Sequence, residues 1–298
     1  MLGSDLADEL YRDFVTTGIV RKPVDFLPVP AVVRGLEKRE DVVKIALREK
    51  PAVILHAAAM TDVDGCEGRR YEALRDNVEA TKAVTEAANA AGAFLIFFST
   101  DYVFDGAKAG EYSETDSCKP LNVYGETKWL AEQYIQQHAA QYVIFRLSWL
   151  FGLRGRSFPL TLLQKAASTP QFRIVSDQHG RPTYTRDVAK AIRFLLSDRP
   201  EALFASSGEV FHLAGAGICS WFDLASYLFD CAGLTQISLE AVPTSQFPRP
   251  AKRPLNSVLA VSKIRERLGV ELPQWKDSIP RFVQEYRNSK FHGVRHAS

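Results

Sequence analysis

The sequence predicts an α/β fold, a doubly wound parallel sheet covered by helices on both faces. Short strands alternate with helical segments through the first half of the chain, and these strands are apolar throughout. Uninterrupted apolar strands are typical of parallel sheets, because crossover helices bury both of their faces. The 298 residues are enough to bury a large core in one domain or in two closely packed ones.

The predicted elements follow one another as helices and strands along the chain. Leu6, Leu10 and Phe14 are spaced by four, which favours a helix over 2–14. The remaining predictions are a short strand over 18–21, an irregular loop over 24–30, a helix over 39–48, a strand over 52–56, an alanine-rich helix over 71–91 closed by Gly92, a strand over 93–98, a helix carrying Tyr124 and Lys128, and a strand over 142–146.

Three of the predicted strands end at or next to small or hydroxyl-bearing residues. Ala57, Thr100 and Ser148 stand at or just beyond the ends of these strands. Ligands of open parallel sheets bind at the carboxyl ends of the strands. We therefore expect these three residues to converge on one site.

Composition excludes several classes of protein. The formal net charge of +2 implies no polyanionic partner such as nucleic acid, and no apolar run reaches the roughly 18 residues of a membrane span. The first residues are amphipathic and include acidic side chains, unlike a signal peptide. The four cysteines show no close pairing, which favours reduced thiols in a cytoplasmic protein and indicates neither a disulfide framework nor a zinc site.

The chemistry suggested by the sequence is carbonyl reduction by hydride transfer. The strand over 93–98 delivers Thr100, and Tyr124 and Lys128 stand four apart on the next helix, so they share one face. A lysine ammonium can lower the pKa of the phenol and help it protonate a developing alkoxide. The Thr100 hydroxyl can hold the same oxygen. We predict these three residues as the catalytic set.

Longer segments around these residues resemble a known family. The chain is similar to the extended short-chain dehydrogenase/reductase family, and within it to the dTDP-4-dehydrorhamnose reductases, from Leu2 to about Tyr286. The segments that carry the resemblance are HAAAMTDVDGCE, FFSTDYVFDG, PLNVYGETKWLAEQ, FRLSWLFG, VSDQHGRPTYTRDVA, FHLAGAGICSWFDLA and RPAKRPLNSVLAVSKI.

This resemblance implies a Rossmann-like fold with a smaller, discontinuous substrate-binding domain. The dinucleotide-binding domain would cover 1–148 with a return segment at about 183–212, and 149–298 would mainly bind substrate. The implied reaction is reduction of the 4-keto group of a nucleotide-linked 6-deoxy sugar, with NADPH as cofactor and NADH also open. A homodimer is compatible with the family.

The beginning of the chain departs from the family pattern. A dinucleotide fold opens with a strand and a Gly-x-x-Gly-x-x-Gly turn, whereas this sequence opens Met1-Leu2-Gly3. By resemblance Gly3 corresponds to the third glycine, with Met1 and Leu2 beside the cofactor, and the first strand is absent. We expect an open slot in the sheet. Either Met1 is an internal residue of a longer protein, or the chain is truncated and binds cofactor poorly.

The resemblance assigns further cofactor contacts. Arg21 and Lys22 follow the second strand of the family, where they could pair with a 2′-phosphate and favour NADPH. Two solvated surface cations are the alternative interpretation. The run Ala57-Ala58-Ala59 would let the backbone approach the cofactor.

Substrate contacts are predicted from the second half of the chain and from the segment after Thr100. Asp101, Tyr102 and Trp149 are candidates by resemblance, and Arg253 could bind a diphosphate. The carboxylates of Asp62, Asp64 and Glu67 lie close in sequence, but helix capping explains them better than Mg²⁺, so no metal is predicted. Trp221, Phe222 and Trp275 are expected in the core.

Two other functions stay open. The regulatory beta subunit of methionine adenosyltransferase has segments similar to STDYVFDG and YGxTK, and it would bind a catalytic partner rather than a sugar. The segment over 18–23 also resembles that protein. A truncated, inactive reductase is the third interpretation, and it follows from the absent first strand.

Overall fold

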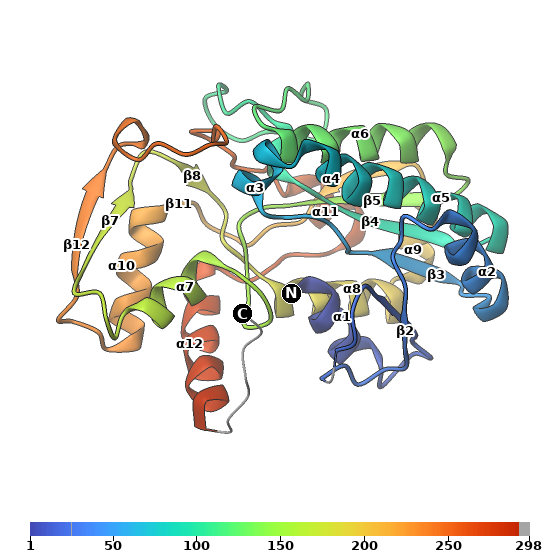
Figure 1. Ribbon diagram of the computed structural model, residues 1–298, viewed down its shortest axis with the longest axis horizontal. Helices are drawn as coiled ribbons and strands as arrows, with labels where there is room; N and C mark the ends of the chain where they lie inside the picture. The colour runs from blue at the N-terminus through green and yellow to red at the C-terminus, as the bar shows by residue number, and fades with distance from the viewer. Residues whose placement is uncertain (25, 292–298) are drawn as a thin grey trace.

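The computed structural model describes residues 1–24 and 26–291. Figure 1 shows a parallel sheet with helices on both faces and, beside it, a smaller lobe that carries β7 and β12. The central sheet has the order β10-β5-β4-β3, and all neighbouring strands are parallel. Its strands are β3 (Val53–His56), β4 (Phe94–Thr100), β5 (Tyr142–Leu147) and β10 (Glu209–His212).

The central strand β4 is buried along its whole length because side chains on both faces pack against helices. Phe94, Ile96 and Phe98 belong to one core cluster with residues of α1 (Leu2–Leu10) and α8 (Thr185–Ser197). Leu95 and Phe97 point to the opposite face and join a second cluster. That cluster includes residues of α2 (Arg39–Glu49), α5 (Ala80–Ala91) and α6 (Val123–His138). The predicted α/β class is therefore confirmed.

The alanine-rich helix predicted over 71–91 is present, but it is not regular. It consists of α4 (Arg70–Leu74), a π-helical turn η1 (Arg75–Glu79) and α5. The C-cap residue Gly92 has a φ of 66°, a left-handed conformation that glycine adopts without steric strain. The π-helical turn is a difference from the sequence prediction.

A second, separate sheet is formed by β1 (Gly18–Val20) and β2 (Ala31–Val33), which pair in parallel. The sequence predicted β1 but not β2. Within the described residues, no strand hydrogen bonds join this pair to the four-stranded sheet. The two sheets are separate, as expected from the predicted open slot in the sheet. The loop predicted over 24–30 is irregular at its described positions, and Asp25 lies outside them.

The chain after β5 forms the smaller lobe and twice returns to the central sheet. Its core lies between the parallel pair β7–β12 and helices α7, α10 and α12. Residues of α8 pack on α1, and β10 pairs with β5. The bounds are β6 (Leu150–Phe151), α7 (Phe158–Lys165), β7 (Gln171–Val175), β8 (His179–Gly180), β9 (Thr183–Tyr184), α9 (Pro200–Ala205), β11 (Cys219–Ser220), α10 (Trp221–Ala232), β12 (Ser238–Val242), η3 (Thr244–Gln246), α11 (Ser262–Leu268) and α12 (Trp275–Phe291).

None of the helices in the described ranges combines the length and apolar character needed to cross a membrane. The four cysteines are free thiols, as predicted.

The position of α6 depends on a close backbone approach. A short 3-10 turn, η2 (Asp101–Val103), follows β4, and the first turn of α6 lies directly against it. A Cβ atom added to Gly125 would clash with the carbonyl oxygen of Tyr102. Glycine at this position therefore lets Tyr124 approach the end of β4.

We predict that Gly125→Ala destabilises the protein by about 1–3 kcal/mol, the usual range for overpacking a well-packed site. Denaturant unfolding followed by circular dichroism measures this change. Gly68→Ala is the matched control, because nothing lies within 4 Å of a Cβ added to this glycine of α3 (Val63–Gly68). Equal stability of the two variants would contradict the proposed contact.

Candidate active site

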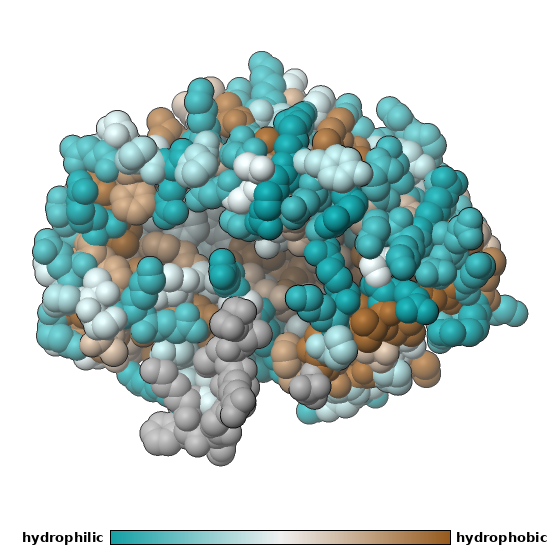
Figure 2. Space-filling view, viewed as in Figure 1, coloured by the Kyte–Doolittle hydropathy of each residue, from teal (hydrophilic) through white to brown (hydrophobic). Residues whose placement is uncertain are grey.

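A cavity of about 1030 Å³ opens at the carboxyl ends of β3, β4 and β5, between the sheet and the smaller lobe. Figure 2 shows the corresponding hollow near the middle of the molecule, with apolar residues at its base. Most of the residues singled out in the sequence line this cavity. They are Met1, Leu2, Ala57, Ala59, Thr100, Asp101, Tyr102, Tyr124, Lys128, Trp149 and Arg253.

Four predicted cofactor residues are not among the residues that line the cavity: Gly3, Ala58, Arg21 and Lys22. Gly3 lies close to it, because a Cβ added there would be 3.8 Å from the Cβ of Ala57. The guanidinium of Arg21 is paired with Asp76 at 2.7 Å, and its side chain is 61% exposed. Arg21 is thus held near the surface, outside the catalytic part of the cavity.

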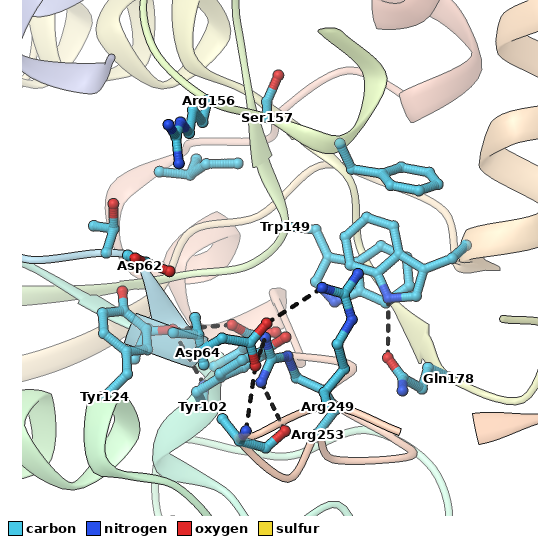
Figure 3. Close-up of a pocket in the computed structure, with 18 of the residues that line it drawn as sticks. Asp62, Asp64, Tyr102, Tyr124, Trp149, Arg156, Ser157, Gln178, Arg249 and Arg253 are labelled. Atoms are coloured by element: carbon cyan, nitrogen blue, oxygen red, sulfur yellow. Dashed lines mark hydrogen bonds and ion pairs between the residues drawn. The ribbon is translucent and has the colours of Figure 1, made fainter. Parts of the chain in front are cut away.

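The geometry of Thr100 and Tyr124 comes from two short caps. The Thr100 hydroxyl oxygen accepts the Tyr102 backbone N–H at 3.2 Å, which closes the turn after β4. Asn122 accepts the Gly125 backbone N–H at 2.8 Å and starts α6 with Tyr124 in its first turn. The rings of Tyr102 and Tyr124 meet edge to face with centroids 6.1 Å apart. Figure 3 shows the two rings side by side in the cavity.

Burial dominates the electrostatics of the catalytic candidates. It raises the pKa of Tyr124, and the neighbouring Thr100 hydroxyl opposes this by stabilising the phenolate. Desolvation of the phenolate is the largest cause of the raised Tyr124 pKa, and it outweighs the opposing Thr100 contact. The effect of a protonated Lys128 on this phenol stays a prediction. Tyr124 is a neutral phenol at physiological pH, which is the form a proton donor needs.

Lys128 is buried, and its ammonium faces the ring of Phe97 at 4.0 Å from the centroid. Among the described residues, no hydrogen-bond acceptor contacts its Nζ atom. Burial lowers the Lys128 pKa to about 7, while Glu132 opposes the shift. Burial and the nearby Lys128 charge also lower the pKa of His56 to about 3, so this histidine is neutral. A buried amine that lines a cavity without an acceptor is suited to bind hydroxyl groups of a ligand.

The far end of the cavity is aromatic. Trp149 and Trp221 are stacked with centroids 3.5 Å apart and ring planes 3° apart, and Phe158 contacts Trp221 edge to face. Trp149 has a φ of 45°, an uncommon conformation for a residue other than glycine. Trp221 was expected in the core, but its Nε1 donates to Gln178 at 3.1 Å and both residues line the cavity. Nothing local in the sequence distinguishes it from the buried Trp275.

Several arginines bring positive charge to the same cavity. Arg253 and Arg249 both pair with Asp64, at 3.0 and 3.4 Å, and Figure 3 shows the three side chains meeting near Tyr102. The sequence singled out Arg253 alone. Besides Arg249, Arg253 and Lys128, the cationic residues that line the cavity are Arg156, Arg173 and Lys252. An anionic ligand such as a phosphate ester would be attracted here.

The three carboxylates considered for Mg²⁺ are each engaged elsewhere. Asp62 accepts the Gly65 backbone N–H at 3.1 Å and caps α3, which confirms the capping prediction. Asp64 binds the two arginines, and Glu67 accepts the backbone N–H of Val123 at 2.9 Å at the start of α6. Within the part of the chain that the structure describes, no group of three or more His, Cys, Asp or Glu side chains could hold a metal ion.

Fold and site together define a class, an α/β protein with its ligand cavity at the carboxyl ends of a parallel sheet. The chain belongs to the RmlD substrate binding domain family, whose model matches residues 1–288. A curated relative from Burkholderia thailandensis, named dTDP-4-dehydrorhamnose reductase, is 34% identical over 286 residues and covers 93% of this chain and 94% of its own. A protein of the same name from Escherichia coli K12 is 36% identical over 255 residues, with 83% of both chains covered.

Solved structures agree with the sequence relatives. A dTDP-4-dehydrorhamnose reductase from Clostridium acetobutylicum superposes with a TM-score of 0.83 at 29% identity, covering 96% of each chain. One from Bacillus anthracis, solved in complex with NADP, has a TM-score of 0.82 at 28% identity and covers 95% of this chain and 96% of its own. A UDP-glucose 4-epimerase from Thermotoga maritima shares the fold at 19% identity, with a TM-score of 0.83 and coverage of 97% and 96%.

We predict that Lys128→Met stabilises the folded protein at neutral pH. The folded-state pKa of about 7 lies below the unfolded value of about 10.4, so protonation favours the unfolded chain. The destabilisation is fully present below about pH 7 and disappears as the pH rises through the unfolded pKa. Each unit of lowered pKa corresponds to about 1.4 kcal/mol, and methionine keeps much of the packing volume.

Thermal unfolding measured from about pH 6.5 to about pH 10 follows the effect, because this range runs between the folded and unfolded pKa values of Lys128. Lys44→Met is the control, because the Lys44 side chain is 74% exposed on α2. The stability difference between Lys128→Met and the unmodified protein should shrink with rising pH. A less stable Lys128→Met protein at neutral pH would contradict the effect of burial.

Proposed function

We propose that this chain is an NADPH-dependent reductase of dTDP-4-dehydrorhamnose that forms dTDP-L-rhamnose. One observation carries the proposal: Thr100, Tyr124 and Lys128, from a strand end and a helix, line one cavity. The curated relatives named dTDP-4-dehydrorhamnose reductase support the substrate class. Their names favour catalysis over the regulatory function of a methionine adenosyltransferase subunit. The proposal also includes membership of the short-chain dehydrogenase/reductase class, a location in the cytoplasm and a homodimeric state.

The cavity suits a nicotinamide dinucleotide. Lys128 presents a buried amine without an acceptor, and small side chains at Ala57 and Ala59 leave the backbone accessible after β3. In the proposed complex Lys128 binds the nicotinamide ribose, Met1, Leu2 and Gly3 lie at the phosphates, and Arg21 and Lys22 lie near the 2′-phosphate. The Bacillus anthracis relative, solved with NADP, supports this choice of cofactor. NADPH, when bound, supplies the hydride for the C4 carbonyl carbon.

The residues of the chain then have distinct tasks. Tyr124 donates its phenolic proton to the C4 oxygen, and Thr100 orients the carbonyl. Lys128 holds the ribose and, when protonated, stabilises the phenolate that Tyr124 leaves behind. The enclosed position of these groups strengthens their electrostatic effect on the developing alkoxide.

The substrate would extend from this catalytic end toward the aromatic and cationic end of the cavity. We assign Tyr102 to the sugar side, Trp149 to stacking, and Arg253 to the diphosphate. Asp101, predicted as a substrate contact, has its two carboxyl oxygens engaged by the Thr100 and Ser148 hydroxyls, so we assign it no direct sugar contact. The guanidinium of Arg253 lies 5.9 Å from the Tyr102 ring centroid, so sugar and diphosphate contacts would be adjacent. In this proposal residues 1–148 and about 183–212 bind the cofactor, and the rest of 149–298 mainly binds substrate.

Purified protein incubated with NADPH and dTDP-4-dehydrorhamnose should oxidise the cofactor and form dTDP-L-rhamnose. Absorbance of NADPH follows the first event, and nuclear magnetic resonance of the sugar identifies the second. UDP-linked 4-keto sugars serve as competing substrates. Absence of NADPH oxidation with the dTDP sugar, in a protein that binds NADPH, would reject the proposed function.

We predict that Tyr124→Phe lowers kcat by about 10²–10⁴, the usual span for a general acid. KM should change little, because the ring and its contact with Tyr102 survive. Thr100→Val should lower kcat less, since it removes one hydrogen bond to the carbonyl oxygen. Tyr134→Phe, on the same helix but outside the cavity, is the control. Near-normal turnover by Tyr124→Phe would overturn its assignment as the acid.

We predict that the double variant Arg21→Ala, Lys22→Ala binds NADPH about tenfold or more weakly, because each charge-assisted contact contributes roughly 1.5–3 kcal/mol. NADH, which lacks the 2′-phosphate, should be much less affected. Calorimetric titration with both cofactors measures the difference. Arg21 must exchange its contact with Asp76 for the phosphate, so equal losses for both cofactors would assign the pair to the solvated surface.

A further inference from the structure

A buried carboxyl group lies directly behind the catalytic candidates. Asp101 begins the turn after β4 and is only 3% exposed. Its Oδ1 atom accepts the Thr100 hydroxyl at 3.1 Å, and its Oδ2 atom accepts the Ser148 hydroxyl at 3.1 Å. The Ser257 hydroxyl also faces this carboxyl. Within the described residues no lysine or arginine forms an ion pair with Asp101, although buried carboxylates are usually paired.

The hydrogen bond from Thr100 to Asp101 limits what Thr100 can do. A threonine hydroxyl has one proton to donate. The Thr100 oxygen already accepts the Tyr102 N–H, and its proton points to Asp101 while that carboxyl is ionised. In that state Thr100 has no proton to offer to a substrate carbonyl oxygen in the cavity or to the neighbouring phenolate oxygen of Tyr124.

Protonation of Asp101 reverses this arrangement. A neutral carboxylic acid is a hydrogen-bond donor as well as an acceptor, so it can donate to the Thr100 oxygen and free the Thr100 proton. The Ser148 and Ser257 hydroxyls likewise accept an N–H, from the Arg181 backbone at 3.4 Å and from Trp149 Nε1 at 3.2 Å, but neither serine lines the cavity. The Thr100 hydroxyl is the one of the three that also faces the reacting end of the cavity.

We propose that Asp101 is a positioning residue that controls, through its protonation, whether Thr100 donates its proton to Asp101 or to the substrate carbonyl. The inference rests on the proposed reductase function and adds a pH-dependent orientation to it. Burial raises the pKa of Asp101 to about 6, since hydroxyl groups oppose the desolvation only in part. The productive orientation is therefore the major one in mildly acidic solution and is progressively lost above that pH.

Other titratable groups surround Asp101 and must be separated from it. Tyr102 on the same turn and Tyr124 on α6 both have raised pKa values and stay neutral. The guanidinium of Arg253 lies over the Tyr102 ring, and the backbone N–H of Arg181 donates to Ser148. Lys128, whose pKa is lowered to about 7, lines the same cavity and must be separated from Asp101 in any pH profile.

The pH dependence of kcat in Asp101→Asn tests the inference. The amide is neutral at every pH and can donate to the Thr100 oxygen, so the variant mimics protonated Asp101. The unmodified enzyme should lose about tenfold or more of its kcat between mildly acidic pH and pH 8, as expected for removal of a carbonyl-oxygen donor. The kcat profile of Asp101→Asn should still show the titration of Lys128 but no longer that of Asp101. At about pH 8 its kcat should be higher than that of the unmodified enzyme.

Ser148→Ala keeps the test decisive if Asp101→Asn does not fold, and a double variant tests the route through Thr100 if it does. Ser148→Ala removes one donor to the ionised carboxyl and should shift the acidic midpoint of the profile upward, because the ionised form loses support. In a Thr100→Val background, replacing Asp101 by Asn should no longer change the profile, since Asp101 acts through Thr100. Asp105→Asn, on the same loop but outside the cavity, is the control.

An unchanged pH profile in Asp101→Asn, or an unshifted midpoint in Ser148→Ala, overturns the inference while leaving the reductase function intact. Failure of the unmodified protein to reduce any nucleotide sugar would instead reject the proposed function itself. A uniform loss of kcat at all pH values would assign Asp101 to a structural role, and it also overturns the inference.

Discussion

The parallel pairing of β4 with β3 on one side and β5 on the other is the constraint on which the site depends. The register places His56 opposite Phe97 and Thr100 opposite Leu147. The chain therefore leaves all three strands at one edge of the sheet. Parallel strands need crossover helices, so the helices that bury the sheet also begin near this edge. One cavity results, with residues from distant parts of the sequence on its walls.

Helix α6 carries Tyr124 and Lys128 into the site. Contacts at its start and further along the helix fix its position. Its start lies against the turn after β4 because Gly125 has no side chain, and Asn122 Nδ2 donates to the carbonyl of Lys252 at 2.8 Å. Further along, Glu132 forms a buried pair with Arg146 of β5 at 2.7 Å. Such a pair contributes little net stability, because desolvation offsets the attraction, but breaking it would leave a buried charge. It holds α6 in one register on the sheet.

The two ends of the cavity differ in polarity, and the difference suits a reductase of a charged substrate. Around Tyr124 and Lys128 the side chains are buried and their ionised forms are disfavoured. At the other end, Arg253 and Arg249 both form ion pairs with Asp64. A nucleotide sugar has the same polarity, with an uncharged ring to be reduced and an anionic diphosphate. Asp101 lies at the boundary, where hydroxyl groups and a backbone N–H stabilise its carboxylate.

Local patterns in the sequence determined much of this protein. Apolar runs predicted β3, β4 and β5 within two residues at each end. Apolar residues spaced by four predicted α1, although α1 ends at Leu10 rather than Phe14. The spacing of Tyr124 and Lys128 predicted their shared face, because helical geometry is set by neighbouring residues. The capping role of Asp62 was also readable, since a cap involves residues three apart.

Only the tertiary structure decided which side chains meet across the cavity. The three-residue strand β2 is too short to show a period, and it forms because β1 offers it a partner. Trp221 reaches the cavity, and Asp101 meets Ser148, through contacts between residues far apart in the chain. Burial, which sets the protonation of Tyr124, Lys128 and Asp101, is likewise a property of the packed molecule. Side-chain periodicity is local, whereas desolvation and long-range hydrogen bonds exist only once the strands and helices have assembled.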